Sequence, residues 1–199
     1  MVLLALLAGT ATAQAHGSRI GGSTAGIPIP SLGHGEMAVM SEYDSEIMDL
    51  ASSASDPDEP FRRVLNFARI EYAACMWELV PGSIVDESSP FNECSHAYLA
   101  GVKQVLLIMR TMPAEAKRAE AIVSRIDAEM TLSGMALIGC QFSSETFNTA
   151  DMISPNWSDV PAHPPSALAF LAFLIVAIGG TWSGVRALGY DPAVPPLLQ

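Results

Sequence analysis

The feature that most constrains this chain is an apolar run near its C-terminal end, from Ala167 to Val185, which contains no charged residue. A helix of that length extends about 28 Å, close to the thickness of the hydrocarbon layer of a bilayer. Near its end, Gly180 and Gly184 stand four residues apart, a spacing that lets two membrane helices approach closely. We therefore expect a transmembrane helix over residues 166–188, with these glycines as a contact face for another membrane protein or for a second copy in a homodimer.

A second apolar stretch opens the chain and is too short to span a membrane. It ends in Ala-Gln-Ala at Ala15, the small-x-small pattern that signal peptidase cleaves. We expect residues 1–15 to be a signal peptide; the alternative is a hydrophobic helix that stays attached. Arg186 lies on the C-terminal side of the long apolar run, where positive charge favours the inner side of a membrane. These features predict a single-pass protein of the bacterial inner membrane, with its bulk in the periplasm and a short cytoplasmic tail at 189–199.

The charge balance of the chain excludes one class of partner. The net charge is −11, and all but one of the 10 Lys and Arg and all but one of the 21 Asp and Glu lie between residues 16 and 165. A negative field of this kind repels nucleic acids and anionic lipids, so we expect no nucleic-acid binding. It attracts cations and basic partners, although acidity also serves solubility alone.

Four segments between residues 36 and 141 have the apolar period of amphipathic helices. The expected helices cover about residues 36–53, 59–79, 90–112 and 114–133. Gly134 and Gly139 weaken helix propensity and predict a kink or an early end between residues 133 and 141. Short connections imply antiparallel neighbours, so the predicted fold is all-α: an up-and-down four-helix bundle over 36–141, stapled by a disulfide.

The segments on either side of the bundle have loop composition. Residues 16–35 are rich in glycine and serine, and residues 142–165 are rich in proline. We expect the first to be a flexible arm and the second a semi-extended spacer that leads to the membrane.

The chain has three cysteines, Cys75, Cys94 and Cys140, and no pair of them has the spacing of a zinc knuckle or a redox motif. In an exported domain they predict one disulfide and one free thiol. All three pairings are feasible, because each cysteine falls near the same end of the bundle. We favour a bridge between Cys94 and Cys140, with Cys75 packed in the core as a small hydrophobic residue.

Catalytic motifs are weak in this sequence. Cys94 and His96 are two residues apart, so on a helix they point about 200° away from each other and cannot pair as nucleophile and base. No phosphate-binding loop, H-E-x-x-H motif or acidic calcium loop is present. We expect no enzymatic activity. If the protein were an enzyme, His96, Glu71 and Glu78 would be the candidates for shifted titration in a cleft.

A metal-binding alternative begins at the predicted cleavage site. Cleavage after residue 15 would expose His16 with a free α-amine beside its imidazole, a bidentate pair suited to Cu(II). His34, Met37 and Met40 follow as further candidate ligands, because imidazole and thioether groups suit the two redox states of copper. The methionines fit the core face of the first helix equally well.

Taken together, the sequence predicts a membrane-anchored periplasmic helical domain. We expect it to act as a non-catalytic accessory or interaction subunit of an envelope complex, with a protein partner in the envelope. The alternative is a periplasmic copper-binding protein that uses a mature N-terminal histidine.

Overall fold

The computed structural model describes residues 25–77, 79–80, 83–140 and 142–187. The elements are β1 (Pro28–Ile29), α1 (His34–Ser52), α2 (Glu59–Ala74), α3 (Asn92–Met109), α4 (Ala116–Ser133), the 3-10 turn η1 (Met135–Leu137), β2 (Phe147–Asn148), the 3-10 turn η2 (Val160–Ala162) and α5 (Pro164–Ala187). The mostly helical class predicted from the sequence is confirmed. The up-and-down order of the bundle stays a prediction. The signal peptide and the cytoplasmic tail lie outside the described residues.

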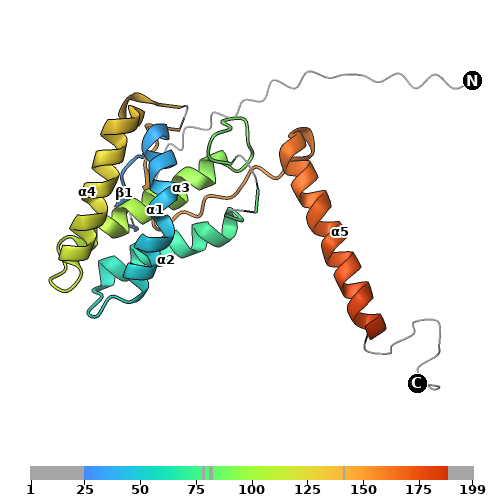
Figure 1. Cartoon of the computed structure of the whole chain (residues 1–199), viewed down its shortest axis with the longest axis horizontal. Coiled ribbons are helices and arrows are strands. Elements are labelled where there is room, and N and C mark those ends of the chain that lie inside the picture. Colours follow the sequence, from blue (N-terminus) through green and yellow to red (C-terminus); the bar gives the residue numbers. More distant parts are fainter. Residues whose placement is uncertain (1–24, 78, 81–82, 141, 188–199) are drawn as a thin grey trace, which may run out of the picture.

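Helix α3 is the centre of the globular part (Figure 1). Every residue from Cys94 to Val102 is buried, so this stretch has no solvent-facing side. Helices α1, α2 and α4 all pack against it. A four-helix bundle of the predicted kind leaves each helix one polar face toward water. The structure differs at α3, which is enclosed by its neighbours.

The ends of the helices follow local chemistry. The side chain of Asp58 caps α2 by accepting a hydrogen bond from the backbone N–H of Phe61 at 2.8 Å. Helix α2 ends at Ala74, about five residues earlier than predicted, and Met76 just beyond it has a positive φ of 49°. Helix α4 ends at Gly134, whose φ of 68° is easiest for glycine, as the sequence indicated.

The disulfide predicted from the sequence is wrong. The structure joins Cys75 to Cys94, with their Cα atoms 5.6 Å apart, and leaves Cys140 as a free cysteine. The turn after α2 places Cys75 beside the first turn of α3. Cys140 instead lies beside His96, two residues beyond Cys94 and so about 200° around the same helix. A bridge between Cys94 and Cys140 would need that loop to cross to the other side of α3.

Where the structure describes them, the predicted arm and spacer are packed against the helices. Strands β1 and β2 pair antiparallel, with Ile29 opposite Phe147, and both of these side chains are buried. Further along the spacer, the backbone N–H of Ile153 donates a hydrogen bond to the Glu71 carboxylate at 2.8 Å. The segments before α1 and after η1 are thereby held together on one side of the domain.

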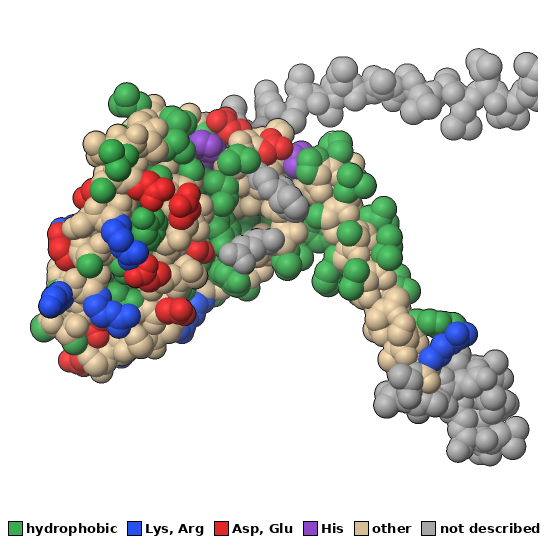
Figure 2. All heavy atoms as spheres, viewed as in Figure 1, with side chains coloured by type: hydrophobic (Ala, Val, Ile, Leu, Met, Phe, Trp, Pro, Cys, Tyr) green, Lys and Arg blue, Asp and Glu red, His purple; other side chains and the backbone are tan. Residues whose placement is uncertain are grey.

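Helix α5 projects away from the globular part (Figure 1). Within the described residues, Pro164–Arg186 is the one helix long and apolar enough to cross a membrane. Its side chains from Leu171 to Arg186 are exposed, and Figure 2 shows apolar side chains along it, whereas most of the charged side chains in this view are scattered over the globular part. The helix is fixed at its base by His163, which contacts the Asp86 carboxylate at 2.9 Å and the Ser166 hydroxyl at 2.7 Å.

Candidate metal centre

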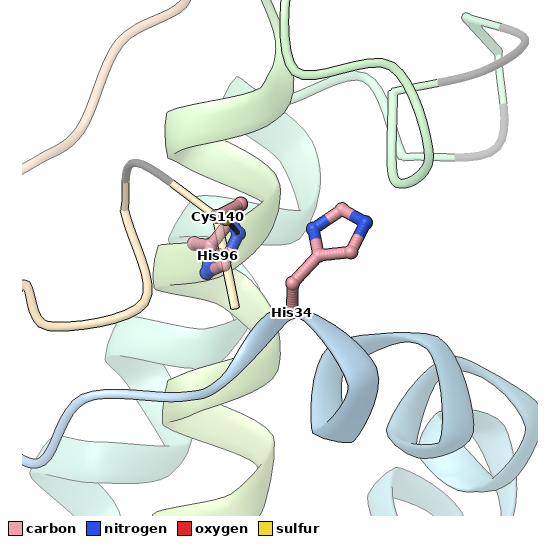
Figure 3. A group of neighbouring side chains, drawn as sticks. All are labelled: His34, His96 and Cys140. Atoms are coloured by element: carbon pink, nitrogen blue, oxygen red, sulfur yellow. Dashed lines mark hydrogen bonds between the residues drawn. The ribbon is translucent and has the colours of Figure 1, made fainter. Parts of the chain in front are cut away.

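Three side chains with metal-ligating atoms meet beside the middle of the fold. They are His34, His96 and Cys140, and one ligand atom from each lies within 4.8 Å of the other two. Figure 3 shows that they come from three separate segments: the start of α1, the central helix α3 and the loop after η1. Three donors bound to one ion at 2.0–2.3 Å lie about 3.5–4 Å from one another. Only a small inward movement separates the observed arrangement from that of a bound metal.

His34 is the first residue of α1, and the backbone around it is held by the loop that carries the cysteine. Its N–H donates a hydrogen bond to the Ser143 hydroxyl at 3.1 Å, and the N–H of Gly35 donates to the Ile138 carbonyl at 3.1 Å. A side chain at Gly35 would collide with the Met135 carbonyl, so only glycine permits this close approach. These contacts fix the backbone that carries the His34 imidazole.

His96 forms the floor of the site. It lies on the enclosed part of α3, is fully buried, and packs against the rings of Phe142 and His34 with centroid distances of 5.9 and 6.1 Å. Burial, then repulsion by His34, lowers the pKa of His96 to about 4, against a smaller opposing effect of the Leu32 carbonyl. His96 is therefore neutral near pH 7, the form in which imidazole binds a metal.

Cys140 supplies the sulfur. Its Sγ atom lies 3.2 Å from Nε2 of His96, and it is the free cysteine left by the Cys75–Cys94 bridge. The cysteine loop is organised by the hydroxyl of Ser143. That hydroxyl accepts hydrogen bonds from the N–H groups of Cys140, at 2.7 Å, and of His34, at 3.1 Å, and donates to the Cys140 sulfur at 3.5 Å. One hydroxyl offers one donor and two acceptor sites, so Ser143 uses its full capacity here.

Among the described residues, Nδ1 of His34 is buried at this site without a hydrogen-bond partner. Leaving a buried polar atom unpaired costs about 1–3 kcal/mol. Such a cost is often found where a ligand or ion completes the site. The unpaired nitrogen of His34 belongs to the same cluster as the Cys140 sulfur and the His96 ring. A bound ion is one way to satisfy it.

Comparison with known proteins adds no candidate to this picture. No protein-family model matches the chain, and neither the curated proteins nor the solved structures compared with it give a match. The function is therefore argued from the geometry of the site and from the helix that carries the domain.

Of the metal ligands expected from the sequence, the cluster in the structure contains one. His34 is in the site, while His16 lies outside the described residues. Met37 is fully buried in the hydrophobic core, one helical turn from His34, and a role for its thioether stays a prediction. Met40 is also a core residue.

Sequence reasoning missed His96 and Cys140 as candidate ligands. The available signal was the odd cysteine: once two of the three cysteines pair, the third needs a partner, and a histidine is a natural one. Pairing Cys94 toward α2 also turns His96 to the opposite side of α3. Neither step identifies the loop at residue 140 without the structure.

The other functional candidates named from the sequence are not part of this cluster. Glu71 is buried and binds the backbone of Ile153, whereas Glu78 lies outside the described residues. Gly180 and Gly184 are exposed on α5, with no atom within 4 Å of where a side chain would begin. Their use as a contact face stays a prediction.

Proposed function

We propose that this chain is a membrane-tethered copper-binding protein whose ion is held by His34, His96 and Cys140. The observation that carries the proposal is the convergence of these three donors, from three segments, around a buried and neutral imidazole. Helix α5 supplies the tether. This proposal replaces the copper site expected at a mature N-terminal histidine with one formed by residues of the helical domain.

The donor set favours a soft or borderline metal. Thiolate and imidazole ligands suit copper and zinc, whereas Ca²⁺ and Mg²⁺ prefer oxygen ligands. Two histidines and one cysteine in a three-fold arrangement are typical of copper sites, and a thioether is their usual weak fourth ligand. Met37, one turn along α1 from His34, is the methionine in sequence reach of that position.

Two features of the whole chain support an exported, membrane-bound position for the site. The Cys75–Cys94 disulfide is typical of proteins from oxidising compartments. The acidic surface raises the local concentration of cations near the domain. We propose the orientation predicted from the sequence, with the globular part in the periplasm of a bacterial cell and the C-terminal end inside.

Metal titration of the full chain in detergent micelles tests the proposal. We expect one Cu(I) per chain in competition with a chromophoric chelator. Cys140→Ser and His96→Gln should each weaken binding at least tenfold, because each removes a direct ligand. His16→Ala is the matched control and should bind as the wild type does. Unchanged affinity in both ligand variants would overturn the site, and loss in the control would return it to the N-terminal arm.

The identity of the ion is tested separately. The same chain is titrated with Zn²⁺ and with Cu(I) under anaerobic conditions. Tighter binding of Zn²⁺ than of Cu(I), with the same response to Cys140→Ser, would keep the site and overturn copper. A Met37→Leu variant, which conserves core volume, shows whether the thioether takes part.

A second candidate function rests on the 3.2 Å contact between the Cys140 sulfur and Nε2 of His96, which is also the geometry of a catalytic cysteine and its base. The low pKa of His96 argues against it, because an activated thiolate is usually paired with a protonated imidazole. Alkylation by iodoacetamide distinguishes the two. A thiolate nucleophile reacts at a rate that is independent of pH down to the pKa of the pair, whereas an ordinary thiol slows tenfold for each pH unit below its own pKa.

The accessory role expected from the sequence is compatible with metal binding, since a tethered metal site serves a partner in the same membrane. We propose that the partner contacts α5 through the face of Gly180 and Gly184. Extraction in mild detergent should recover the chain with larger membrane proteins or as a dimer. Substitution of both glycines by isoleucine should release it, and an unchanged assembly would contradict this contact.

A further inference from the structure

The base of α5 is surrounded by apolar side chains of the globular part. A groove with about 100 Å³ of free space lies between Met76, Leu79 and Val80, which follow α2, and Ala169, Phe170 and Phe173 of α5. Trp157 and Phe91 also contact the ring of Phe170, with ring centroids 5.6 and 5.9 Å away. We call the residues Met76, Leu79, Val80, Val85 and Trp157 the collar.

Three of the five collar side chains are exposed to solvent. Leu79 is 60% exposed, Val85 is 72% exposed and Trp157 is 50% exposed. The sequence from Leu79 to Val85 contains no charged residue, and the acidic residues Asp86 and Glu87 follow it directly. Exposed apolar side chains without charged neighbours in sequence, with a tryptophan nearby, are typical of protein surfaces at a membrane boundary.

The length of α5 decides what covers this surface. Its far end is marked by Arg186, whose guanidinium lies 4.8 Å from the ring centre of Trp182, an arrangement suited to the membrane interface. A helix needs about 20 apolar residues to cross the hydrocarbon layer. Counting back from Val185, about 20 residues reach Ser166, which is already fully buried in the base of the helix. The groove residues of α5 end at Phe173. The stretch beyond it, from Leu174 to Val185, is shorter than the layer, so a spanning α5 brings the groove residues into the layer as well.

We infer that the collar is a lipid-contact surface, in which Leu79, Val85 and Trp157 lie in the same bilayer that α5 crosses. The inference rests on the tether in the proposed function and is independent of the metal. The lipid surface continues from α5 onto the collar, because Leu79 lines the groove beside Phe170 and Phe173. Trp157 packs against Phe170, and Val85 directly precedes Asp86, which contacts His163 at the base of α5. The domain thus sits on the membrane rather than above it on a free linker.

Quenching by brominated lipid tests this contact in the full chain, reconstituted in nanodiscs of phosphatidylcholine with or without bromine near the headgroup end of the acyl chains. The chain has three tryptophans, and Trp77 is buried under Tyr98 and serves as the internal reference. The variant Trp182→Phe reports Trp157, and Trp157→Phe reports Trp182. The double variant gives the baseline of Trp77 and should lose no fluorescence.

We expect both single variants to lose fluorescence in brominated nanodiscs. Quenching of Trp182 without quenching of Trp157 overturns the lipid contact while leaving the tether intact. No quenching of Trp182 overturns the tether and the collar with it. An unquenched Trp157 in nanodiscs that hold two chains would place a second copy in the groove, which also overturns the inference. Leu79→Trp in the double variant repeats the measurement from the groove side, and quenching there is expected as well.

Discussion

At the scale of single residues, Ser143 makes three hydrogen bonds with a single hydroxyl group. Its hydroxyl connects the backbone of His34, the backbone of Cys140 and the Cys140 sulfur, although it is not itself a ligand. It therefore acts as a positioning residue. Groups of this kind hold the ligands in the geometry that the metal needs before the metal arrives.

Ser143→Ala should weaken Cu(I) binding about 10- to 100-fold, because two partly buried N–H groups lose their acceptor and the sulfur loses a donor. Chelator competition measures the affinity. Ser144→Ala, at the exposed neighbouring position, is the matched control and should have no effect. Ser143→Thr keeps the hydroxyl and should recover most of the affinity. Equal affinities in all variants would mean that Ser143 has no part in the site.

The low pKa of His96 predicts that the free energy of unfolding of the metal-free protein depends on pH. Its pKa is about 4 when folded and near 6.5 when unfolded, so below pH 6.5 the unfolded chain binds more protons. Stability from this group is thus present above pH 6.5 and falls as the pH drops, reaching a loss of about 3 kcal/mol near pH 4.

Denaturant unfolding of the wild type and of His96→Gln between pH 7 and pH 4 measures this loss. The carboxylates contribute equally to both proteins, so the difference in slope belongs to the histidine. Parallel pH profiles in the two proteins would contradict the low pKa.

Sequence patterns could suggest His34 as a candidate ligand because an imidazole in the glycine-rich arm, downstream of His16, suits copper. They did not suggest the other two residues of the proposed site. His96 is on a helix that is buried on all sides, so periodicity does not indicate which way it points. Cys140 is in a loop whose path depends on contacts with distant residues such as His34 and Ser143.

At the scale of elements, the helices follow capping and turn chemistry, and three of the four predicted for the domain have nearly the expected bounds. The exception is α2, where an apolar stripe continues past Ala74 but the chain turns at Met76. The bond from Cys75 to Cys94 and the packing of Trp77 on Tyr98, with ring centres 4.7 Å apart, favour the turn over further helix. Local propensity does not contain these tertiary contacts.

Removal of the disulfide should destabilise the domain through the unfolded state. The bond closes a loop with a sequence separation of 19 residues, which corresponds to about 3 kcal/mol in the chain-entropy model. We expect Cys75→Ala with Cys94→Ala to lower the free energy of unfolding by about that amount in denaturant titrations. Cys140→Ser in the metal-free protein is the control. An equal loss in the control would show that the pairing has been assigned to the wrong cysteines.

At the scale of the whole molecule, the chain has an acidic, charged globular part and an apolar helix that projects from it (Figure 2). The sequence predicts this division, because the run from Ala167 to Val185 contains no charged residue. The packing of the arm and spacer was not readable, since glycine- and proline-rich segments also form well-packed loops. Ile29 and Phe147 are apolar residues of such segments that pair with each other and are buried.

The proposed orientation predicts which end of the chain is accessible from outside. In a Cys140→Ser background, a cysteine at the exposed position Ser158 should react with a membrane-impermeant maleimide in cells whose outer membrane has been opened. A cysteine at Gln199 should react only after lysis. The reverse pattern would place the globular part inside and contradict the orientation.

The pairing of β1 with β2 has a consequence for how the ion is taken up. It joins the chain just before His34 to the chain a few residues after Cys140, so the two outer ligands are brought together by the backbone. The entropy of closing that long loop is offset when the domain folds rather than when the ion binds. In small zinc domains the opposite holds, and stripping the metal unfolds the chain. In the proposed copper protein, a chelator should therefore remove the ion and leave the helical circular-dichroism spectrum unchanged, as expected of a carrier that stays folded without its metal.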